Sequence, residues 1–393
     1  MKPKILILGA GYAGIIAANR LDKQVKDAEI VLISESSGFK ERIRYHETAS
    51  AGLKKEILIR DLLRTNVNFL QTKVTGILPK EKTVIIEAKN QNVHYDYLVI
   101  ALGSSEIRKI QTKENSIQSK DAVLEFLKRK EISKIQNLCI IGSGLTGLEM
   151  ATEWKYFYPK SRVTLIDRSE LGSSFSKKAK EYLHTYLLKN EIEVLDKTKI
   201  DKIEGNEIQF ENQTKRSFDC IINCTGFQSS SLPKESGFKT NSQNRIYVDP
   251  FLRSLEYPEV FVAGDSAYLE NSILRMGCVT ALPMGAYIAD HLANVIQGKN
   301  LSPFSFQFAG RCMSLGREDG LIQMTHGDDK PKEWIIKGKW GAFIKELVNR
   351  FTIFSLMMEK NLPFRFYFWP KGNPILEKEK RISKPMVAGD LVV

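Results

Sequence analysis

The clearest chemical signal near the start of the chain is a glycine loop of the pattern GxGxxG, formed by Gly9, Gly11 and Gly14. An apolar run at 5–8 before the loop predicts a buried strand, and a run at 15–21 after it predicts a helix. A second strand-like run at 29–34 ends at Glu35. In such a unit the glycines permit a tight turn and the close approach of a pyrophosphate, which the helix N-terminus stabilises. Glu35 is then placed to accept hydrogen bonds from ribose hydroxyls.

The same unit recurs further along the chain, with its glycines at Gly142, Gly144 and Gly147. Its second strand, at 162–167, ends in Asp167, 20 residues past the last glycine. We interpret the two units as two dinucleotide sites; the alternative is that one of them has a purely structural role. The Asp167 carboxylate would repel a 2′-phosphate, which favours NADH, although the adjacent Arg168 could accommodate NADPH.

Strands and helices alternate between and after these units, which predicts parallel sheets and an α/β architecture. Further strands are predicted at 69–78, 83–88, 96–104, 207–210, 220–226 and 260–267, and the stretch 69–95 is typical of an antiparallel meander. Further helices are predicted at 119–130, 177–190 and 279–296.

Composition narrows the class of protein. With 393 residues, 42% hydrophobic and 26% charged, the chain is long enough for two or three domains and too apolar to be largely disordered. Its net charge of +12 favours anionic partners, among which are nucleotides, nucleic acid and anionic lipid.

The five cysteines are scattered and form no CxxC motif, which argues against a zinc site or a disulfide framework and favours a reducing compartment. No run of 18 apolar residues predicts a transmembrane helix.

The last part of the chain is more basic and more aromatic. Residues 330–393 hold 13 Lys/Arg, 6 Asp/Glu and 10 aromatic residues. Five apolar residues recur there at helical spacing: Phe343, Leu347, Phe351, Phe354 and Met358. The opposite face is expected to carry Lys345, Glu346, Asn349 and Arg350. This amphipathic helix could pack on the rest of the protein, pack on a second subunit, or lie on an anionic membrane surface. Residues 377–384 predict a solvated tail.

Together the motifs resemble the pyridine nucleotide-disulfide oxidoreductase superfamily of flavoproteins, over residues 4 to about 325. Three segments resemble its strand-end motifs: VIALGS at 99–104, INCTGF at 222–227 and VFVAGDSA at 260–267. One departure is Leu102, where the superfamily usually has threonine. The resemblance implies two Rossmann-like domains, with an NAD(P)H-binding domain inserted in an FAD-binding domain. The implied boundaries are 1–108 and 242–310 for the FAD domain, 109–241 for the NAD domain and 311–393 for a C-terminal region.

The resemblance also implies which residues bind the two cofactors. Beside the first glycine loop and Glu35, the FAD contacts would be Tyr12, Ala13, Arg42, Val74, Ala101, Gly103, Gly264, Asp265, Thr280 and Ala281. Asp265 is implied to contact the ribityl chain, and the helix at 279–296 is implied to point its N-terminus at the flavin. Beside the second glycine loop and Asp167, the nicotinamide cofactor would contact Leu145, Thr146 and Gly226.

Members of the superfamily that reduce disulfides need a redox-active cysteine pair, which this sequence lacks. Cys220 and Cys224 would lie about 13 Å apart on one strand, too far for a bridge. The sequence therefore resembles the branch of type II NADH dehydrogenases and of apoptosis-inducing-factor-like and ferroptosis-suppressor-like quinone reductases, to which the segments 38–52 and 312–323 are also similar. In that branch Glu149 is implied to be the catalytic residue; the alternative is a first-turn acid stabilised by the helix dipole.

The resemblance implies an enzyme that passes a hydride from NADH to FAD and two electrons to a quinone-like acceptor, without a metal and without nucleic acid. Two other functions stay open from the sequence. One is a soluble NAD(P)H reductase of a ferredoxin- or rubredoxin-type carrier, and the other is a flavoprotein with mainly an interaction or signalling role. We expect a cytoplasmic protein, with peripheral membrane attachment or a homodimer as roles for its C-terminal region.

Overall fold

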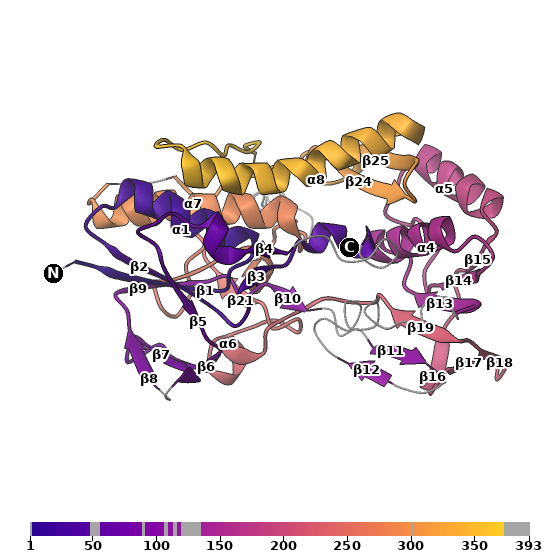
Figure 1. The fold of residues 1–393 in the computed structure, drawn as a ribbon, viewed down its shortest axis with the longest axis horizontal. Helices are drawn as coiled ribbons and strands as arrows, with labels where there is room; N and C mark the ends of the chain where they lie inside the picture. The colour runs from indigo at the N-terminus through magenta and orange to yellow at the C-terminus, as the bar shows by residue number, and fades with distance from the viewer. Residues whose placement is uncertain are drawn as a thin grey trace, which may run out of the picture.

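The computed structural model describes residues 2–47, 56–88, 91–105, 109–112, 116–118, 135–299 and 302–372. The helix predicted at 119–130 and the tail predicted at 377–384 lie outside these residues. The molecule has two halves, each built on a mainly parallel sheet, and the long helix α8 (Gly338–Asn361) runs across both of them (Figure 1). The predicted α/β architecture is confirmed.

The first half contains a five-stranded parallel sheet in the order β22-β9-β1-β2-β5. Its strands in chain order are β1 (Lys4–Leu8), β2 (Glu29–Ser34), β5 (Asn68–Gln71), β9 (Tyr97–Ile100) and β22 (Val260–Val262). Helices α1 (Tyr12–Gln24) and α7 (Cys278–Ile296) lie together beside this sheet (Figure 1). They pack closely, because a Cβ atom on Gly285 of α7 would overlap the backbone of Ala13. Strand β22 joins this sheet from far along the chain, after the whole second sheet.

The second half contains a six-stranded sheet in the order β12-β11-β19-β13-β14-β15. Its strands are β11 (Lys109–Thr112), β12 (Ser116–Gln118), β13 (Asn137–Ile141), β14 (Arg162–Ile166), β15 (Ile192–Leu195) and β19 (Cys220–Asn223). The last four run parallel, and β11 is antiparallel to β19. Helices α4 (Leu145–Phe157) and α5 (Lys177–Lys189) belong to this half. Ser176 caps α5, since its side chain accepts a hydrogen bond from the N–H of Ala179.

Three small antiparallel sheets complete the two halves. They consist of β6 (Val74–Leu78), β7 (Thr83–Ile86) and β8 (Gln91–His94); β16 (Ile200–Glu204), β17 (Glu207–Phe210) and β18 (Lys215–Ser217); and β24 (Gly310–Leu315), β25 (Asp319–Thr325) and β26 (Pro331–Lys337). The predicted meander is confirmed for β6–β8. The single strand predicted at 69–78 is wrong, because Thr72 and Lys73 separate β5 from β6 and the two strands join different sheets.

The remaining elements are short. Paired two- and three-residue strands are β3 (Gly38–Phe39) with β4 (Ile57–Leu58), β10 (Ser104–Ser105) with β20 (Gln228–Ser229), and β21 (Ile246–Val248) with β23 (Ala267–Leu269). The short helices are α6 (Leu232–Glu235) and the 3₁₀ turns η1 (Arg42–Arg44), η2 (Ile59–Leu62) and η5 (Gly264–Ser266).

Helix α8 turns its polar face inward and its apolar face outward. Lys345 and Asn349 are 4% and 1% exposed, whereas Phe343 and Phe351 are 55% and 49% exposed. This is the reverse of the usual surface helix. Lys345 and Asn349 do lie opposite the apolar stripe, as predicted, but theirs is the buried face; the alternative that the stripe packs on the rest of the protein is therefore wrong.

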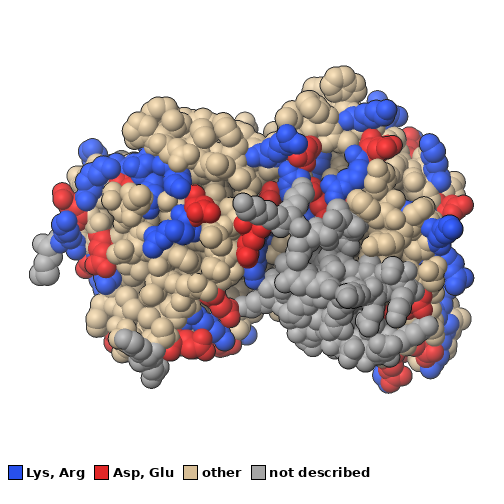
Figure 2. Space-filling view, viewed as in Figure 1, with Lys and Arg blue, Asp and Glu red and all other residues tan. Residues whose placement is uncertain are grey.

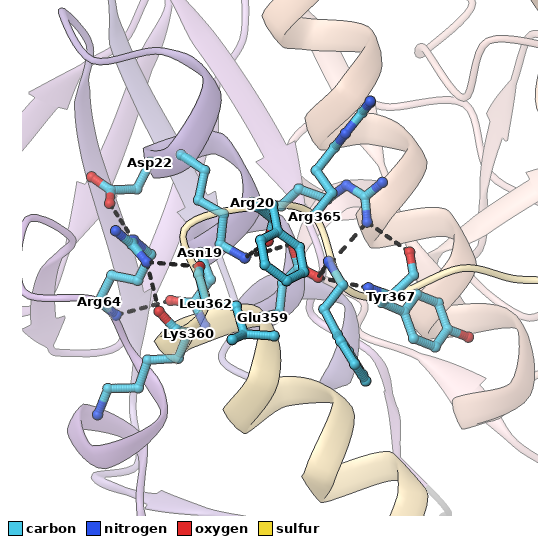
Figure 3. Close-up of polar contacts among 12 residues, drawn as sticks. Asn19, Arg20, Asp22, Arg64, Glu359, Lys360, Leu362, Arg365 and Tyr367 are labelled. Carbon is cyan, nitrogen blue, oxygen red and sulfur yellow. Dashed lines mark hydrogen bonds and ion pairs between the residues drawn. The ribbon is translucent and has the colours of Figure 1, made fainter.

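The C-terminal end of α8 is held on α1 by a buried cluster of charges (Figure 3). Glu359 is fully buried; its carboxylate lies 3.0 Å from the Lys23 ammonium and accepts hydrogen bonds from the N–H groups of Phe366 and Tyr367. Arg64 donates a hydrogen bond of 2.6 Å to the carbonyl of Lys360, one of the carbonyls left unpaired by the end of the helix. In this way α8 is anchored at a fixed place on α1.

None of the helices in the described ranges is long and apolar enough to cross a membrane.

Replacing Glu359 with Gln tests whether this cluster anchors α8. The variant leaves the buried Lys23 ammonium without its counter-charge, so we expect the free energy of unfolding to fall by about 3 kcal/mol, measured by denaturant titration. The matched control is Glu270→Gln at an exposed position, which should change it by less than about 0.5 kcal/mol. Equal effects of the two substitutions would show that the cluster does not hold the helix.

Candidate functional site

The first glycine loop is closely packed at two of its glycines and open at the third. Gly9 has φ +101°, and a Cβ atom there would collide with the backbone of Ala101, so this position needs glycine. Gly14 is similarly closed, because a Cβ would overlap the carbonyl oxygen of Gly9. At Gly11, by contrast, a Cβ atom would meet nothing within 4 Å. The loop is thus packed tightly on its inner side and open where a pyrophosphate would approach α1.

Asp265 lies beside this loop in a network that also includes Arg42. Its carboxylate accepts hydrogen bonds of 2.6 Å from the Ser104 hydroxyl and 2.6 Å from the N–H of Gly277, the residue before α7. Arg42 donates to the carbonyl of Ser104 at 2.7 Å and lies 3.7 Å from the Asp265 carboxylate. The turn η1, the start of β10, the turn η5 and the start of α7 are therefore joined at one place.

The start of α7 also approaches the first loop directly. A Cβ atom on Gly264 would lie 3.2 Å from Cβ of Ala281 and 3.7 Å from Cβ of Ala13. The Thr280 hydroxyl donates to the carbonyl of Arg275 at 2.6 Å, which fixes the first turn of the helix. Four residues predicted to contact FAD are thus brought together from three separate segments.

The second glycine loop repeats the geometry of the first. Gly142 has φ +102°, and a Cβ atom on Gly144 would meet nothing within 4 Å. Asp167 lies at the loop, where its carboxylate accepts hydrogen bonds from the N–H and hydroxyl of Ser143 at 2.6 and 2.8 Å and from the N–H of Ser169 at 2.8 Å. The carboxylate is therefore held at the end of β14, where ribose hydroxyls would reach it.

Most of the other predicted cofactor residues lie at strand ends or at the start of α4, and one, Val74, lies in β6. Glu35 is exposed directly after β2, and Leu145 and Thr146 begin α4. Ala101 donates its N–H to the carbonyl of Leu8, beside the first loop. Gly103 and Gly226 have φ of +70° and +76° in the turns after β9 and β19. Val74 begins β6, outside the parallel sheet, two residues after Thr72, whose N–H reaches the end of β2.

Glu149 lies where three parts of the chain meet. Its Oε1 atom lies 2.9 Å from the ammonium of Lys345 on α8 and accepts a hydrogen bond of 3.0 Å from the N–H of Ser314 on β24. Its Oε2 atom lies 3.6 Å from Nδ1 of His46, just after η1. The alternative role as a first-turn acid is wrong, because Glu149 is the fifth residue of α4 and its first turn has no acidic residue.

The charges of these three side chains depend on one another. Burial acts to raise the pKa of the Glu149 carboxyl, but the Lys345 ammonium and His46 outweigh it and hold that pKa below its ordinary value. Burial acts to lower the pKa of Lys345, and the Glu149 carboxylate holds it well above its ordinary value. Burial lowers the pKa of His46, against the opposing effect of Glu149. At neutral pH the site therefore contains an ion pair between Glu149 and Lys345 and a neutral imidazole.

A chain of alternating charges leads from this site toward solvent. It runs through Glu153, Arg317, Glu47, Arg44, Glu346 and Arg350, with successive charged atoms 2.6–3.3 Å apart. It starts on α4, one turn after Glu149, and ends on α8, where the Arg350 side chain is 74% exposed. The chain joins both halves of the molecule to α8 around the buried ion pair.

Lys345 is the functional candidate that sequence reasoning missed. The helical spacing of α8 does not show whether the face that carries Lys345 is buried or solvated. The apolar stripe on the opposite face was the stronger signal for the buried face. The sequence does show that Lys345 shares one helical face with Asn349, Thr352, Ser355 and Glu359. In the structure all of these residues are buried. Polar residues at helical spacing fit an inward polar face as well as a solvated one, provided that partners such as Glu149 exist elsewhere in the chain.

Comparison with known proteins relates this arrangement to a family. A family model described as pyridine nucleotide-disulphide oxidoreductase matches residues 3–289. The chain is 27% identical over 339 residues to ferroptosis suppressor protein 1 of Xenopus tropicalis, with 82% of this chain and 88% of the relative covered. It is also 27% identical over 403 residues to a type II NADH:quinone oxidoreductase of Staphylococcus haemolyticus, with 90% and 96% covered.

Solved structures share the fold. The sulfide:quinone oxidoreductase of Aquifex aeolicus gives a TM-score of 0.75 at 20% identity, covering 91% of this chain and 92% of that one. NDH2 of Plasmodium falciparum in complex with NADH gives 0.71 at 16% identity, covering 94% and 100%. The two-sheet α/β arrangement is therefore one that known oxidoreductases also have.

Substituting each open glycine tests the two loops separately. Gly11 and Gly144 have φ of −82° and −65°, which valine also adopts, so Gly11→Val and Gly144→Val should fold. We expect Gly11→Val to purify without flavin, because its side chain fills the space of the pyrophosphate, and Gly144→Val to keep its flavin and lose nicotinamide binding by tenfold or more. Flavin absorbance and calorimetric titration measure these outcomes, and each variant is the control for the other. If Gly11→Val kept its full flavin content, the first glycine loop would not be the flavin-binding loop.

Proposed function

The chain belongs to the pyridine nucleotide-disulphide oxidoreductase family, and we propose that it is an FAD-dependent enzyme that oxidises NADH and reduces a quinone. The observation that carries this proposal is the buried pair of Glu149 and Lys345, with Glu149 on the helix that follows the second glycine loop, in a chain with two open glycine loops and without a CxxC or CxxxxC pair. Proton-carrying groups at such a place suit an acceptor that takes up protons together with electrons. The names of the relatives, type II NADH:quinone oxidoreductase and ferroptosis suppressor protein 1, support the same assignment.

The proposed cofactor positions follow from the two loops. FAD would lie along the first loop, with its diphosphate at the start of α1 and its ribityl chain at Asp265. The N-terminus of α7 would place positive helix-end charge near the flavin ring. NADH would lie along the second loop, where Asp167 accepts the ribose hydroxyls and disfavours a 2′-phosphate. When bound, FAD supplies the redox chemistry, taking a hydride from NADH and passing two electrons on.

Glu149 and Lys345 would serve the quinone. The Lys345 ammonium carries three N–H donors, and in the described residues two of them go to Glu149 and to the carbonyl of Cys312 at 3.4 Å. The third can donate to a quinone oxygen, where it would stabilise developing negative charge. Glu149 would hold or move the proton that this oxygen requires. Residues from both halves and from α8 would thus act on one acceptor.

The outer face of α8 would attach the enzyme to an anionic membrane surface. Its exposed apolar side chains include Trp340, Phe343, Leu347, Phe351 and Phe354, and Phe364 and Phe368 follow them at 59% and 72% exposed. Exposed cations lie along the same segment, namely Lys337, Lys339, Arg350, Arg365 and Lys371. Figure 2 shows uncharged residues over much of the edge where Figure 1 places α8, with Lys and Arg beside them. An apolar stripe with a basic rim matches anionic lipid, and quinones are found in lipid.

Anaerobic stopped-flow measurements test the proposed reaction and the role of Glu149. NADH should reduce the bound flavin with a higher kcat/KM than NADPH, and a water-soluble quinone should reoxidise it. In Glu149→Gln we expect reoxidation by quinone to slow by roughly tenfold or more, because a proton-carrying group is lost, with a smaller effect on reduction by NADH. Protein that holds FAD but is not reduced by NADH would contradict the proposed function.

Variants of the Glu149–Lys345 ion pair show whether a slower reoxidation in Glu149→Gln reflects lost chemistry or lost stability. Lys345→Met leaves the Glu149 carboxylate buried without its partner and should lower the free energy of unfolding by about 3 kcal/mol. The double variant Glu149→Gln/Lys345→Met removes both charges, so it should recover much of the stability and none of the rate. If the single variants lose stability while reoxidation keeps its wild-type rate, the pair is structural only.

Co-sedimentation with vesicles tests the membrane surface. We expect the protein to bind vesicles that contain phosphatidylglycerol more strongly than neutral vesicles, and added salt to weaken binding. The triple variant Phe343→Ser/Leu347→Ser/Phe351→Ser should bind at least tenfold more weakly. Leu188→Ser is the matched control, because Leu188 is 81% exposed on α5 in the other half of the molecule. A dimer that the triple variant dissociates, without vesicle binding by the wild type, would instead assign this face to a second copy of the chain.

A further inference from the structure

The two oxygens of the Glu149 carboxylate have different surroundings. Oε1 faces two donors, the Lys345 ammonium at 2.9 Å and the N–H of Ser314 at 3.0 Å. Oε2 faces Nδ1 of His46 at 3.6 Å. An oxygen that already accepts from two donors is a poor place for a further proton. A proton that binds to Glu149 therefore binds at Oε2, on the side of the imidazole.

His46 lies near this oxygen and also near the chain of charges that reaches solvent. Its side chain is 3% exposed. The charged groups that face it are Glu149 of α4, Lys345 of α8, Glu47 of its own segment and Arg317 of the β24–β25 turn. Glu47 and Arg317 both belong to the chain that ends at the exposed Arg350. The imidazole is thus close both to Glu149 and to this charged chain.

Quinone reduction by NADH takes up one proton from solution in each turnover. The hydride carries two electrons and one proton, whereas a quinone needs two electrons and two protons to become a hydroquinone. At neutral pH Glu149 is ionised in its pair with Lys345 and has no proton to give. Lys345 holds its own proton firmly, because the carboxylate beside it stabilises the ammonium. Another group must therefore bring the second proton to Glu149.

Resting on the quinone reductase activity proposed above, we propose that His46 carries this proton from solution to Oε2 of Glu149, which passes it to the quinone oxygen. His46 gains a proton at Nε2 and loses one at Nδ1, which leaves a neutral imidazole in its other tautomer; exchange of its ring proton with solvent restores the Nδ1–H tautomer before the next turnover. The Lys345 pairing at Oε1 is kept throughout. Burial lowers the pKa of His46 below its ordinary value, which makes its protonated form a stronger acid than a histidine in water.

The first test measures the coupling between His46 and its two charged neighbours without enzyme turnover. The chain has five histidines, so ¹⁵N-labelled imidazole signals of the FAD-loaded protein can be followed by NMR from pH 5 to 8, with His46 assigned by its loss in His46→Gln. We expect the pKa of His46 to fall in Glu149→Gln, which removes a negative charge, and to rise in Lys345→Met, which removes a positive one. An unchanged pKa of His46 in Glu149→Gln would overturn the proposal.

The second test separates the half-reactions in His46→Gln and His46→Asn. Reduction of the flavin by NADH should stay within twofold of wild type. Reoxidation by a water-soluble quinone should slow by roughly tenfold or more. In the wild type this rate should fall as the pH rises through the pKa of His46, and the variants should lose that pH dependence. The matched control is His291→Gln, a histidine of α7 that is 5% exposed and stacks on Tyr287, away from Glu149.

The outcomes distinguish this proposal from the proposed function. If the wild type is reoxidised by quinone and the His46 variants match it in rate and pH dependence, only the role of His46 is overturned. If the wild type is reduced by NADH but no quinone reoxidises it, the proposed function and the role of His46 both fall. If His291→Gln slows reoxidation as much as His46→Gln does, the effect belongs to the loss of any buried histidine, and the proposal is also overturned.

Discussion

The buried ion pair between Glu149 and Lys345 is the interaction on which the arrangement of this molecule depends. Two charges removed from water are costly unless each has the other and further hydrogen bonds. Here the carboxylate comes from the second half of the molecule, the ammonium from α8, and the neighbouring imidazole from the first half. The two sheets and the C-terminal helix must therefore keep a fixed relation for the pair to stay satisfied. The chain of charges from Glu153 to Arg350 adds further links between the same three parts.

This requirement explains why α8 buries its polar face and exposes its apolar face. A helix that supplies Lys345, Asn349 and Glu359 to buried partners has to place its polar face against the protein, and its apolar face is then left outside. Gly320 and Gly341 permit a close approach of α8 to β25, because a Cβ atom on Gly341 would overlap the carbonyl oxygen of Gly320. At the other end the Glu359 cluster holds α8 on α1. The exposed apolar stripe is thus a consequence of satisfying buried charges on the inner face.

Local sequence signals predicted most of the fold and less of the site. The glycine loops, β1, β2, α5 and α7 were predictable, because each carries its own periodicity or its own steric requirement for glycine. Strand β5 was merged with β6, since an apolar stretch does not show which sheet each part joins. The helical spacing of α8 was clear, but its orientation depends on Glu149, which lies 196 positions away from Lys345. The roles of His46 and Lys345 depend on their contacts with Glu149, which is far away in the sequence, so no local pattern predicts them.

The order of strands in the first sheet has a consequence for how the chain folds during synthesis. Strands β1, β2, β5 and β9 leave the ribosome early, but β22 and α7 follow only after the whole second sheet. At ~5–20 residues per second the 160 residues from Ile100 to Val260 take about 10–30 s. Over that time α1 lacks its partner helix α7 and the β9 edge lacks β22, whereas the second sheet can form from one continuous segment. The nascent chain is therefore expected to complete its later half first and to need protection of the earlier half from aggregation until α7 arrives.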